Sequence, residues 1–198
     1  MKNFEVTSKE DGKKYWISRS VAVTGIIYSG ELCRYNLIHN PESIKILLER
    51  RGPGCPDNVG KLALPCGYLD WDETAEQAMS REIYEELGLT IDPEEFHLCG
   101  TNTNPEDDAR QNIVLMFLAN YDKLVELETV KYISDSASHN TVERGGEKDE
   151  VSEVIVVSLD ELYSKMTDEE FAFDHRERIL SFFYPQPGCT KRKKKLKS

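Results

Sequence analysis

"GYLDWDETAEQAMSREIYEELGL", residues 67–89, shows the strongest pattern in this chain. The stretch contains seven carboxylates and only one basic residue, Arg81. We predict a helix from about Asp72 to Leu87, which Gly88 would end. Its predicted buried face is an apolar stripe with i, i+4 spacing, made of Ala75, Met79, Ile83 and Leu87.

The acids of this helix lie beside the apolar stripe rather than opposite it. At about 100° per residue, Glu86 is about 40° from Glu82 on one side, and Glu85 is about 60° from it on the other. A solvated helix face usually mixes charges, whereas only Arg81 compensates these acids. Two interpretations are open, an acidic surface or a site for a hard divalent cation. We favour the cation, because a local rule broken in this way often marks a functional site.

The composition is typical of a globular protein. The 198 residues, 31% charged and 39% hydrophobic, suffice for one domain with a substantial core. No apolar run approaches the length of a membrane span, and the first residues lack the apolar centre of a signal peptide. We therefore expect a cytoplasmic protein with no membrane partner. The five cysteines have no C-x-x-C spacing, which favours reduced thiols and no zinc site.

The charge is distributed unevenly along the chain. The net charge is −11, yet the last eight residues, KRKKKLKS, carry six positive charges and no negative ones, so the other 190 residues carry −17. Such an acidic body argues against nucleic acid as a partner. The basic tail, residues 185–198, could bind nucleic acid or an anionic surface. We favour a disordered terminal segment.

The remaining sequence predicts an α/β domain over residues 15–184, after a flexible polar segment of residues 1–14. Strands are predicted over residues 15–29, 43–50, 61–69, 95–102, 112–121 and 151–158. Two further helices are predicted over residues 159–166 and 174–183, and a polar loop over residues 134–150. Because several strands are adjacent, we expect a mixed sheet between helices rather than a regular doubly wound sheet.

The spacing from Gly67 to Leu89 matches the Nudix box, G-x5-E-x7-R-E-U-x-E-E-x-G-U, in which U is aliphatic. All seven fixed identities and both aliphatic positions are present. The chain therefore resembles the Nudix hydrolase superfamily, over roughly residues 16–183. The resemblance implies an α/β/α sandwich around the mixed sheet.

The resemblance also implies an activity and a cofactor. Nudix hydrolases use divalent cations, usually magnesium with manganese as a substitute, to hydrolyse a diphosphate linkage in a nucleoside diphosphate joined to another group. The implied partner is a small nucleotide substrate. Nucleotide sugars, dinucleotides and nucleoside triphosphates all stay open, and dimers are frequent enough in the family to leave a homodimer open.

Site residues follow from the resemblance by position. The implied metal ligands are Glu82, Glu85, Glu86 and the backbone carbonyl of Cys66. Arg81 would orient a box glutamate. Glu73 would contact the ligands without binding the metal, and Gly67 would allow the tight turn before the helix. The catalytic set implied by the box is Glu82, Glu86, Arg81 and Glu85. One departure is Cys66, because the family commonly has glycine before Gly67; we favour an inert packed thiol over a reactive one.

The general base and the phosphate ligands are less determined. Some family members use a box glutamate as the base, and others use an acid on a downstream loop. The downstream candidates here are Glu147, Asp149 and Glu150, each of which could also be a solvated loop residue. Arg51 and Arg110 are predicted to lie in loops near the site, where they could contact phosphate.

Two alternatives to a small-nucleotide hydrolase stay open. The first is a sensor module that binds a nucleotide-like ligand without cleaving it, as degenerate members of the superfamily do. The intact box argues against it, and so does the segment after residue 166, which is too short for an added winged helix. The second is RNA cap hydrolysis assisted by the basic tail. The hydrolase is our prediction.

Overall fold

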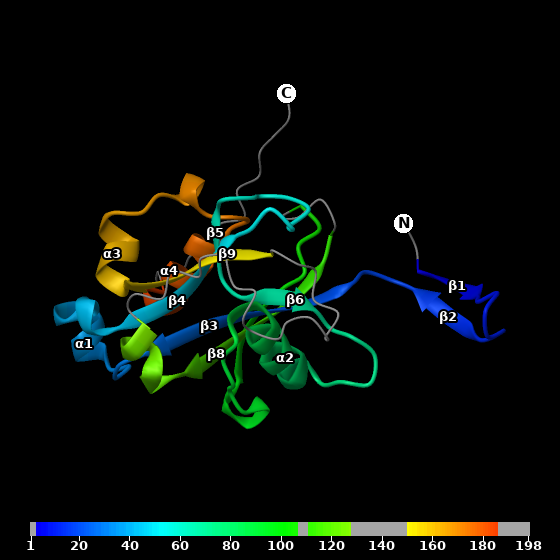
Figure 1. The fold of residues 1–198 in the computed structure, drawn as a ribbon, viewed down its shortest axis with the longest axis horizontal. Helices are drawn as coiled ribbons and strands as arrows, with labels where there is room; N and C mark the ends of the chain where they lie inside the picture. Colours follow the sequence, from blue (N-terminus) through cyan, green and yellow to red (C-terminus); the bar gives the residue numbers. More distant parts are fainter. Residues whose placement is uncertain (1–2, 107–110, 128–149, 186–198) are drawn as a thin grey trace, which may run out of the picture.

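A seven-stranded mixed sheet forms the centre of the computed structural model, which describes residues 3–106, 111–127 and 150–185 (Figure 1). The main path runs in the order β5-β4-β3-β8-β7, while β6 also pairs with β3 and β9 with β4. Among the strands of the described residues, β3 and β8 are the one parallel pair. The strands are β3 (Val21–Ser29), β4 (Lys45–Arg51), β5 (Leu62–Ala63), β6 (Cys66–Tyr68), β7 (His97–Asn102), β8 (Ile113–Asn120) and β9 (Val151–Ser158). The predicted mixed sheet is confirmed.

Helices cover both faces of this sheet, with α2 on one side and α3 and α4 on the other (Figure 1). The helices are α1 (Arg34–His39), α2 (Ala75–Leu87), α3 (Leu159–Ser164) and α4 (His175–Phe183). Short 3-10 helices occupy Pro41–Ser43, Pro93–Glu95, Asp122–Leu127 and Asp168–Glu170. The predicted α/β/α layering is therefore confirmed.

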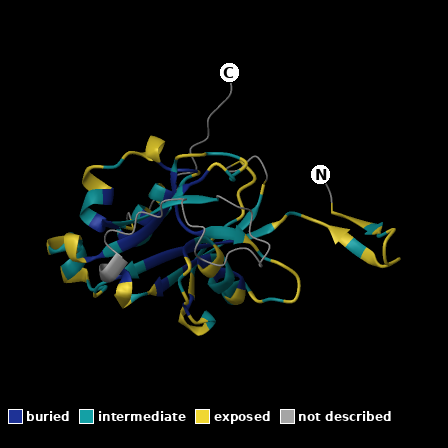
Figure 2. Cartoon of the chain, viewed as in Figure 1, coloured by how far each residue is buried: buried dark blue, intermediate teal, exposed yellow. Residues whose placement is uncertain are grey.

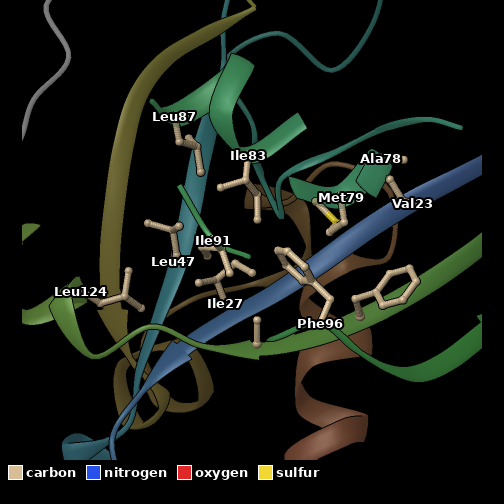
Figure 3. Close-up of a cluster of buried hydrophobic side chains, with 12 residues drawn as sticks. Val23, Ile27, Leu47, Ala78, Met79, Ile83, Leu87, Ile91, Phe96 and Leu124 are labelled. Atoms are coloured by element: carbon tan, nitrogen blue, oxygen red, sulfur yellow. The ribbon is translucent and has the colours of Figure 1, made fainter. Parts of the chain in front are cut away.

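Alternation along the central strands divides the core into two clusters. Leu47 of β4 packs on the α2 side, whereas its neighbours Ile46 and Leu48 pack on the side of α3 and α4. Figure 3 shows the first cluster, in which Met79 and Ile83 of α2 face the strands. All five of these side chains have no exposed surface, so α2 is held firmly against the sheet.

Strands β3 and β4 pair over only two positions, Tyr28 with Ile46 and Ser29 with Lys45. Beyond them, β6 joins β3 at residues 22–24, while β4 continues between β5 and β9. The segment that we predicted as one strand, residues 61–69, is therefore two. Pro65 interrupts it, because proline has no amide hydrogen for a sheet hydrogen bond.

Helix α2 begins three residues later than predicted, at Ala75. Asp72 has a left-handed backbone, with φ of 65°, and so lies outside the helix. Thr74 caps the helix through a capping box with Gln77. At the other end Gly88 takes a left-handed conformation, with φ of 68°, which ends the helix as predicted.

The start of the chain differs from the prediction. We expected residues 1–14 to be flexible and residues 15–29 to form one strand, but β1 (Phe4–Thr7) pairs with β2 (Lys14–Ile17) in a separate hairpin. The hairpin projects from the body and is largely exposed (Figures 1 and 2). The turn at Gly12, with φ of 71°, was the missed signal. The proposed domain boundaries stay predictions.

Two further features bear on the sequence predictions. Helix α1 was missed, because its six residues bury no side chain and so leave no apolar stripe. The four cysteines among the described residues, Cys33, Cys55, Cys66 and Cys99, are free thiols. No helix in the described part of the chain is long and apolar enough to span a membrane.

Candidate functional site

Arg81 connects most of the acids of the box. Its guanidinium binds both oxygens of Glu73, at 3.1 and 2.8 Å, and donates to the carbonyl of Tyr68 at 2.9 Å. Its Nη1 lies 2.8 Å from Oε1 of Glu82 and 3.0 Å from Oε2 of Glu85. A planar guanidinium can hold several carboxylates at once in this way. Arg81 is thus placed to orient Glu82 and Glu85, while Glu73 holds Arg81 from the other side.

Gly67 provides the space in which the Glu82 carboxylate lies. A Cβ atom built on Gly67 would be 2.0 Å from Cδ of Glu82 and 2.1 Å from its Oε1. No side chain fits at this distance, so the glycine is required for the observed position of Glu82. We predicted that Gly67 allows a tight turn before the helix. In the structure, the glycine allows the backbone of β6 to contact Glu82 of α2.

Glu86 turns away from Arg81 and toward the sheet. Its Oε2 accepts a hydrogen bond from the amide of Cys66 at 3.1 Å, and its carboxyl interacts directly with that of Glu49 on β4. Arg81 thus binds Glu82 and Glu85, whereas the amide of Cys66, the first residue of β6, binds Glu86. The charge of Glu82 still acts on Glu86, and the role of the three acids as metal ligands stays a prediction.

Burial dominates the electrostatics of these acids. It raises the pKa of Glu86 well above its usual value, and the neighbouring Glu49 and Glu82 raise it further. Burial likewise raises the pKa of Glu49 to about 8, opposed by Arg51. Burial also raises the pKa of Glu82, opposed by Arg81, whereas hydrogen bonds from Arg81 lower the pKa of Glu73. Like charges placed together out of water resist ionisation unless a cation joins them.

The backbone at Cys66 is compatible with a residue other than glycine. Its φ is not among the positive values found in the described residues, so this position does not require glycine. Burial, with Glu86 and Glu49 nearby, raises the pKa of its thiol well above the usual value, which agrees with an inert side chain. The amide of Cys66 binds Glu86, and the predicted metal contact of its carbonyl stays a prediction.

Arg51 lies at the end of β4 and is buried, with 8% of its surface exposed. Its guanidinium donates to the carbonyl and the carboxylate of Asp57, at 3.2 and 3.3 Å, and lies 5.3 Å from the ring centroid of Phe173. It also lies near enough to Glu49 to oppose the rise in its pKa. Arg50, by contrast, points outward and pairs with Glu153 at 2.8 Å.

Glu150 is the one downstream candidate within the described residues. Its backbone carbonyl accepts hydrogen bonds from the amide of Gly52 and the thiol of Cys55, at 2.6 and 3.1 Å. Its charge raises the pKa values of Glu82 and Glu49, so it lies near the box acids. The other candidates, Glu147, Asp149 and Arg110, lie outside the described residues, and their roles stay predictions.

Glu49 is the site residue that sequence reasoning missed. It is 1% exposed, and its Oε2 has no hydrogen-bond partner in the described part of the chain. Alternation along β4 places it on the same face as Leu47, which is the α2 face. The signal in the sequence was an acid that directly follows the buried apolar run Ile46–Leu48. Only the packing of α2 on the sheet shows that it meets Glu86.

The side chains of the site have the oxygen atoms that a divalent cation prefers, but they are not arranged around one point. Within the described ranges, no three His, Cys, Asp or Glu side chains are placed together to hold a metal ion. However, Glu49 has a buried oxygen without a donor, and Gly67 leaves space that the Glu82 carboxylate occupies. Carboxylate oxygens of this kind suit magnesium or manganese. Binding would require Glu82 to share its oxygens between Arg81 and the cation.

Comparison with known proteins identifies a family and a relative of this chain. The model of the NUDIX domain family matches residues 34–180. An ADP-ribose pyrophosphatase of Methanocaldococcus jannaschii is 32% identical over 114 residues, which cover 56% of this chain and 56% of that protein. The match thus spans about half of the relative's length.

Solved structures share the fold at low sequence identity. The NUDIX domain of Shewanella oneidensis NrtR, solved with ADP ribose, has a TM-score of 0.55 and 21% identity, covering 82% of this chain and 85% of that one. NrtR from the same organism, solved with a 27mer DNA, has a TM-score of 0.53 and 20% identity, covering 80% and 58%. At such identities the similarity shows the fold alone.

Proposed function

The chain belongs to the NUDIX domain family, and from this premise we propose that it hydrolyses a diphosphate linkage with the help of a divalent cation. The substrate class is a nucleoside diphosphate joined to another group. The observation that carries the proposal is the contact between the Glu82 carboxylate and Gly67, where a side chain would lie 2.0 Å from Glu82. A solvated acidic surface would not need a glycine in contact with its carboxylate.

The residues of the site would have different roles. Glu82, Glu85 and Glu86 would hold the cation, together with the carbonyl of Cys66. When bound, the cation would neutralise phosphate oxygens and lower the pKa of a water molecule. Arg81 keeps Glu82 and Glu85 in place through hydrogen bonds of 2.8 and 3.0 Å. This order reduces the rearrangement needed when the substrate binds.

A carboxylate must also take the proton of the attacking water. Glu86 and Glu150 are the described candidates, because both lie beside the other box acids. Arg51 could contact a substrate phosphate, since a guanidinium matches phosphate geometry and this one lies next to the acids. Its bonds to Asp57 and its position over Phe173 would hold it ready.

ADP-ribose is the first substrate to test. The Methanocaldococcus relative is an ADP-ribose pyrophosphatase, although the match covers only 56% of that protein. The Shewanella domain was solved with ADP ribose. Other nucleotide sugars, dinucleotides and nucleoside triphosphates form the rest of the panel, since the box itself does not select among them.

A substrate panel with magnesium or manganese tests the proposal. We expect turnover that stops with a chelator, and from ADP-ribose the products AMP and ribose 5-phosphate, measured by chromatography and mass spectrometry. Hydrolysis in labelled water identifies which phosphorus atom is attacked. The absence of turnover on the whole panel with either cation would overturn the hydrolase proposal.

The sensor module is the second candidate function. The observation in its favour is that the described residues hold no group of three ligands already arranged for a metal ion. Isothermal titration with ADP-ribose separates the two functions. Binding without any product after prolonged incubation with magnesium would support the sensor, whereas product formation would exclude it.

A further inference from the structure

Glu49 lies outside the box, and the proposed cation ligands, general base and phosphate contact do not include it. It stands on β4 between Ala63 of β5 and Val154 of β9 in the sheet pairing. Only 1% of its surface is exposed, and its Oε2 has no hydrogen-bond partner among the described residues. A buried carboxylate without a donor is costly, and native proteins rarely keep one without a reason.

The surroundings of Glu49 show where this oxygen could find a partner. Its side chain interacts with Glu86, and the charges of Glu82 and Glu150 also act on it. The positive charge of Arg51 acts on Glu49, but its guanidinium donates to Asp57 at 3.2 and 3.3 Å. Glu49 also shares a side-chain hydrogen bond with Glu86, yet among the described residues its Oε2 still has no partner.

We propose that Glu49 is a further carboxylate ligand of the divalent cation, contributed by the sheet rather than by the box helix. The inference rests on the proposed cation-dependent function. A hard cation between Glu49 and Glu86 would give the unpartnered oxygen an electrostatic partner and join two acids that repel each other. The cation would then be bound by ligands from two different elements, β4 and α2, both of which are packed in the core.

This role explains the division of the box acids. Arg81 already holds Glu82 Oε1 and Glu85 Oε2, so these two acids offer the cation only part of their oxygens. Glu86 accepts from the Cys66 amide through Oε2, which leaves its other oxygen for the cation. With Glu49, the site gains a ligand that Arg81 does not share.

Titration with manganese tests the proposal without any turnover. The free Mn²⁺ signal in electron paramagnetic resonance measures binding to the full-length protein in the absence of substrate. We expect Glu49→Gln to weaken Mn²⁺ binding by at least about tenfold. The matched control is Glu153→Gln, which removes one charge from β9, where Glu153 pairs with Arg50 on the outward face. The control should bind Mn²⁺ like the wild type.

Thermal unfolding without metal provides a second measurement. We expect Glu49→Gln to keep or raise the melting temperature of the metal-free protein, because the amide can still hydrogen-bond with Glu86 and adds no charge beside Glu82 and Glu86. A lower melting temperature, or failure to fold, would show that the protein itself satisfies the charge of Glu49, and would overturn the proposal.

The outcomes separate this proposal from the proposed function. Equal Mn²⁺ affinity of wild type and Glu49→Gln would overturn the role of Glu49 and leave cation-dependent hydrolysis intact. A wild type that binds no Mn²⁺ without substrate would also overturn it, while turnover of the substrate panel would still stand. Loss of binding in Glu49→Gln alone supports the proposal even if the substrate is still unidentified.

Discussion

The substitution Glu86→Gln separates a metal site from an acidic surface. The amide oxygen can still accept the hydrogen bond from the Cys66 amide, now 3.1 Å long, and the amide nitrogen can donate to Glu49. Because burial raises the pKa of Glu49 to about 8, this is a hydrogen bond between mostly uncharged groups at neutral pH, worth about 0.5–1.5 kcal/mol, and the wild type already has one there. We therefore expect the metal-free protein to keep its stability or to gain up to about 1 kcal/mol of unfolding free energy, which is about 2–4 °C in melting temperature for a chain of this size.

The response to metal should change in the opposite direction. Magnesium at millimolar concentration should raise the melting temperature of the wild type, because a ligand of the folded state stabilises it by mass action. Glu86→Gln should lose most of this rise, since an amide is a poor ligand for a hard cation. Turnover of the best substrate should fall by about two to four orders of magnitude.

Asp72→Asn is the matched control. Asp72 is exposed and has a φ of 65°, a conformation that asparagine also adopts readily. The variant removes one charge close to the box and should change turnover little. Equal, small losses of turnover in both variants would show that Glu86 holds no catalytic cation. A destabilised metal-free Glu86→Gln would show that the protein itself satisfies the buried carboxyl, and either result refutes the reasoning.

Because burial raises the pKa of Glu49 to about 8 and also raises that of Glu86, the folded state binds more protons than the unfolded state. Above about pH 6.5, where the buried His175 with its pKa lowered to about 3 adds no opposing slope, metal-free stability should thus fall as pH rises toward about 8, by up to about 1.4 kcal/mol per pH unit per group, and calorimetry with saturating magnesium should show a flatter profile. Gly67→Ala should fold, because the Glu82 carboxylate can swing away from a Cβ that would lie 2.0 Å from it, but turnover should fall at least about 100-fold, as kinetics and circular dichroism together would show. Arg81→Lys should lower the unfolding free energy by about 1–3 kcal/mol in urea and reduce turnover, because a single ammonium cannot replace a fork that binds three glutamates and a carbonyl.

Local patterns of residues were enough to predict the helix and the residues of the box. The apolar stripe of α2 is local, and three of its four predicted members, Met79, Ile83 and Leu87, are buried while Ala75 is partly buried. The layers of the fold were also predictable, because each strand carries its own pattern of apolar residues. Such features depend on residues within one or two helical turns or along one strand, so the printed order of residues contains them.

The arrangement of the acids depends on contacts between distant parts of the chain. Whether Glu86 faces Arg81 or the sheet depends on the end of β6, which is 20 residues away along the chain. Glu49 reaches the same place from β4, and no spacing in the sequence relates it to Glu86. The physical reason is that strand pairing and the packing of α2 on the sheet are non-local contacts. They bring a buried carboxyl group with an unpartnered oxygen to a box whose fixed positions are all filled.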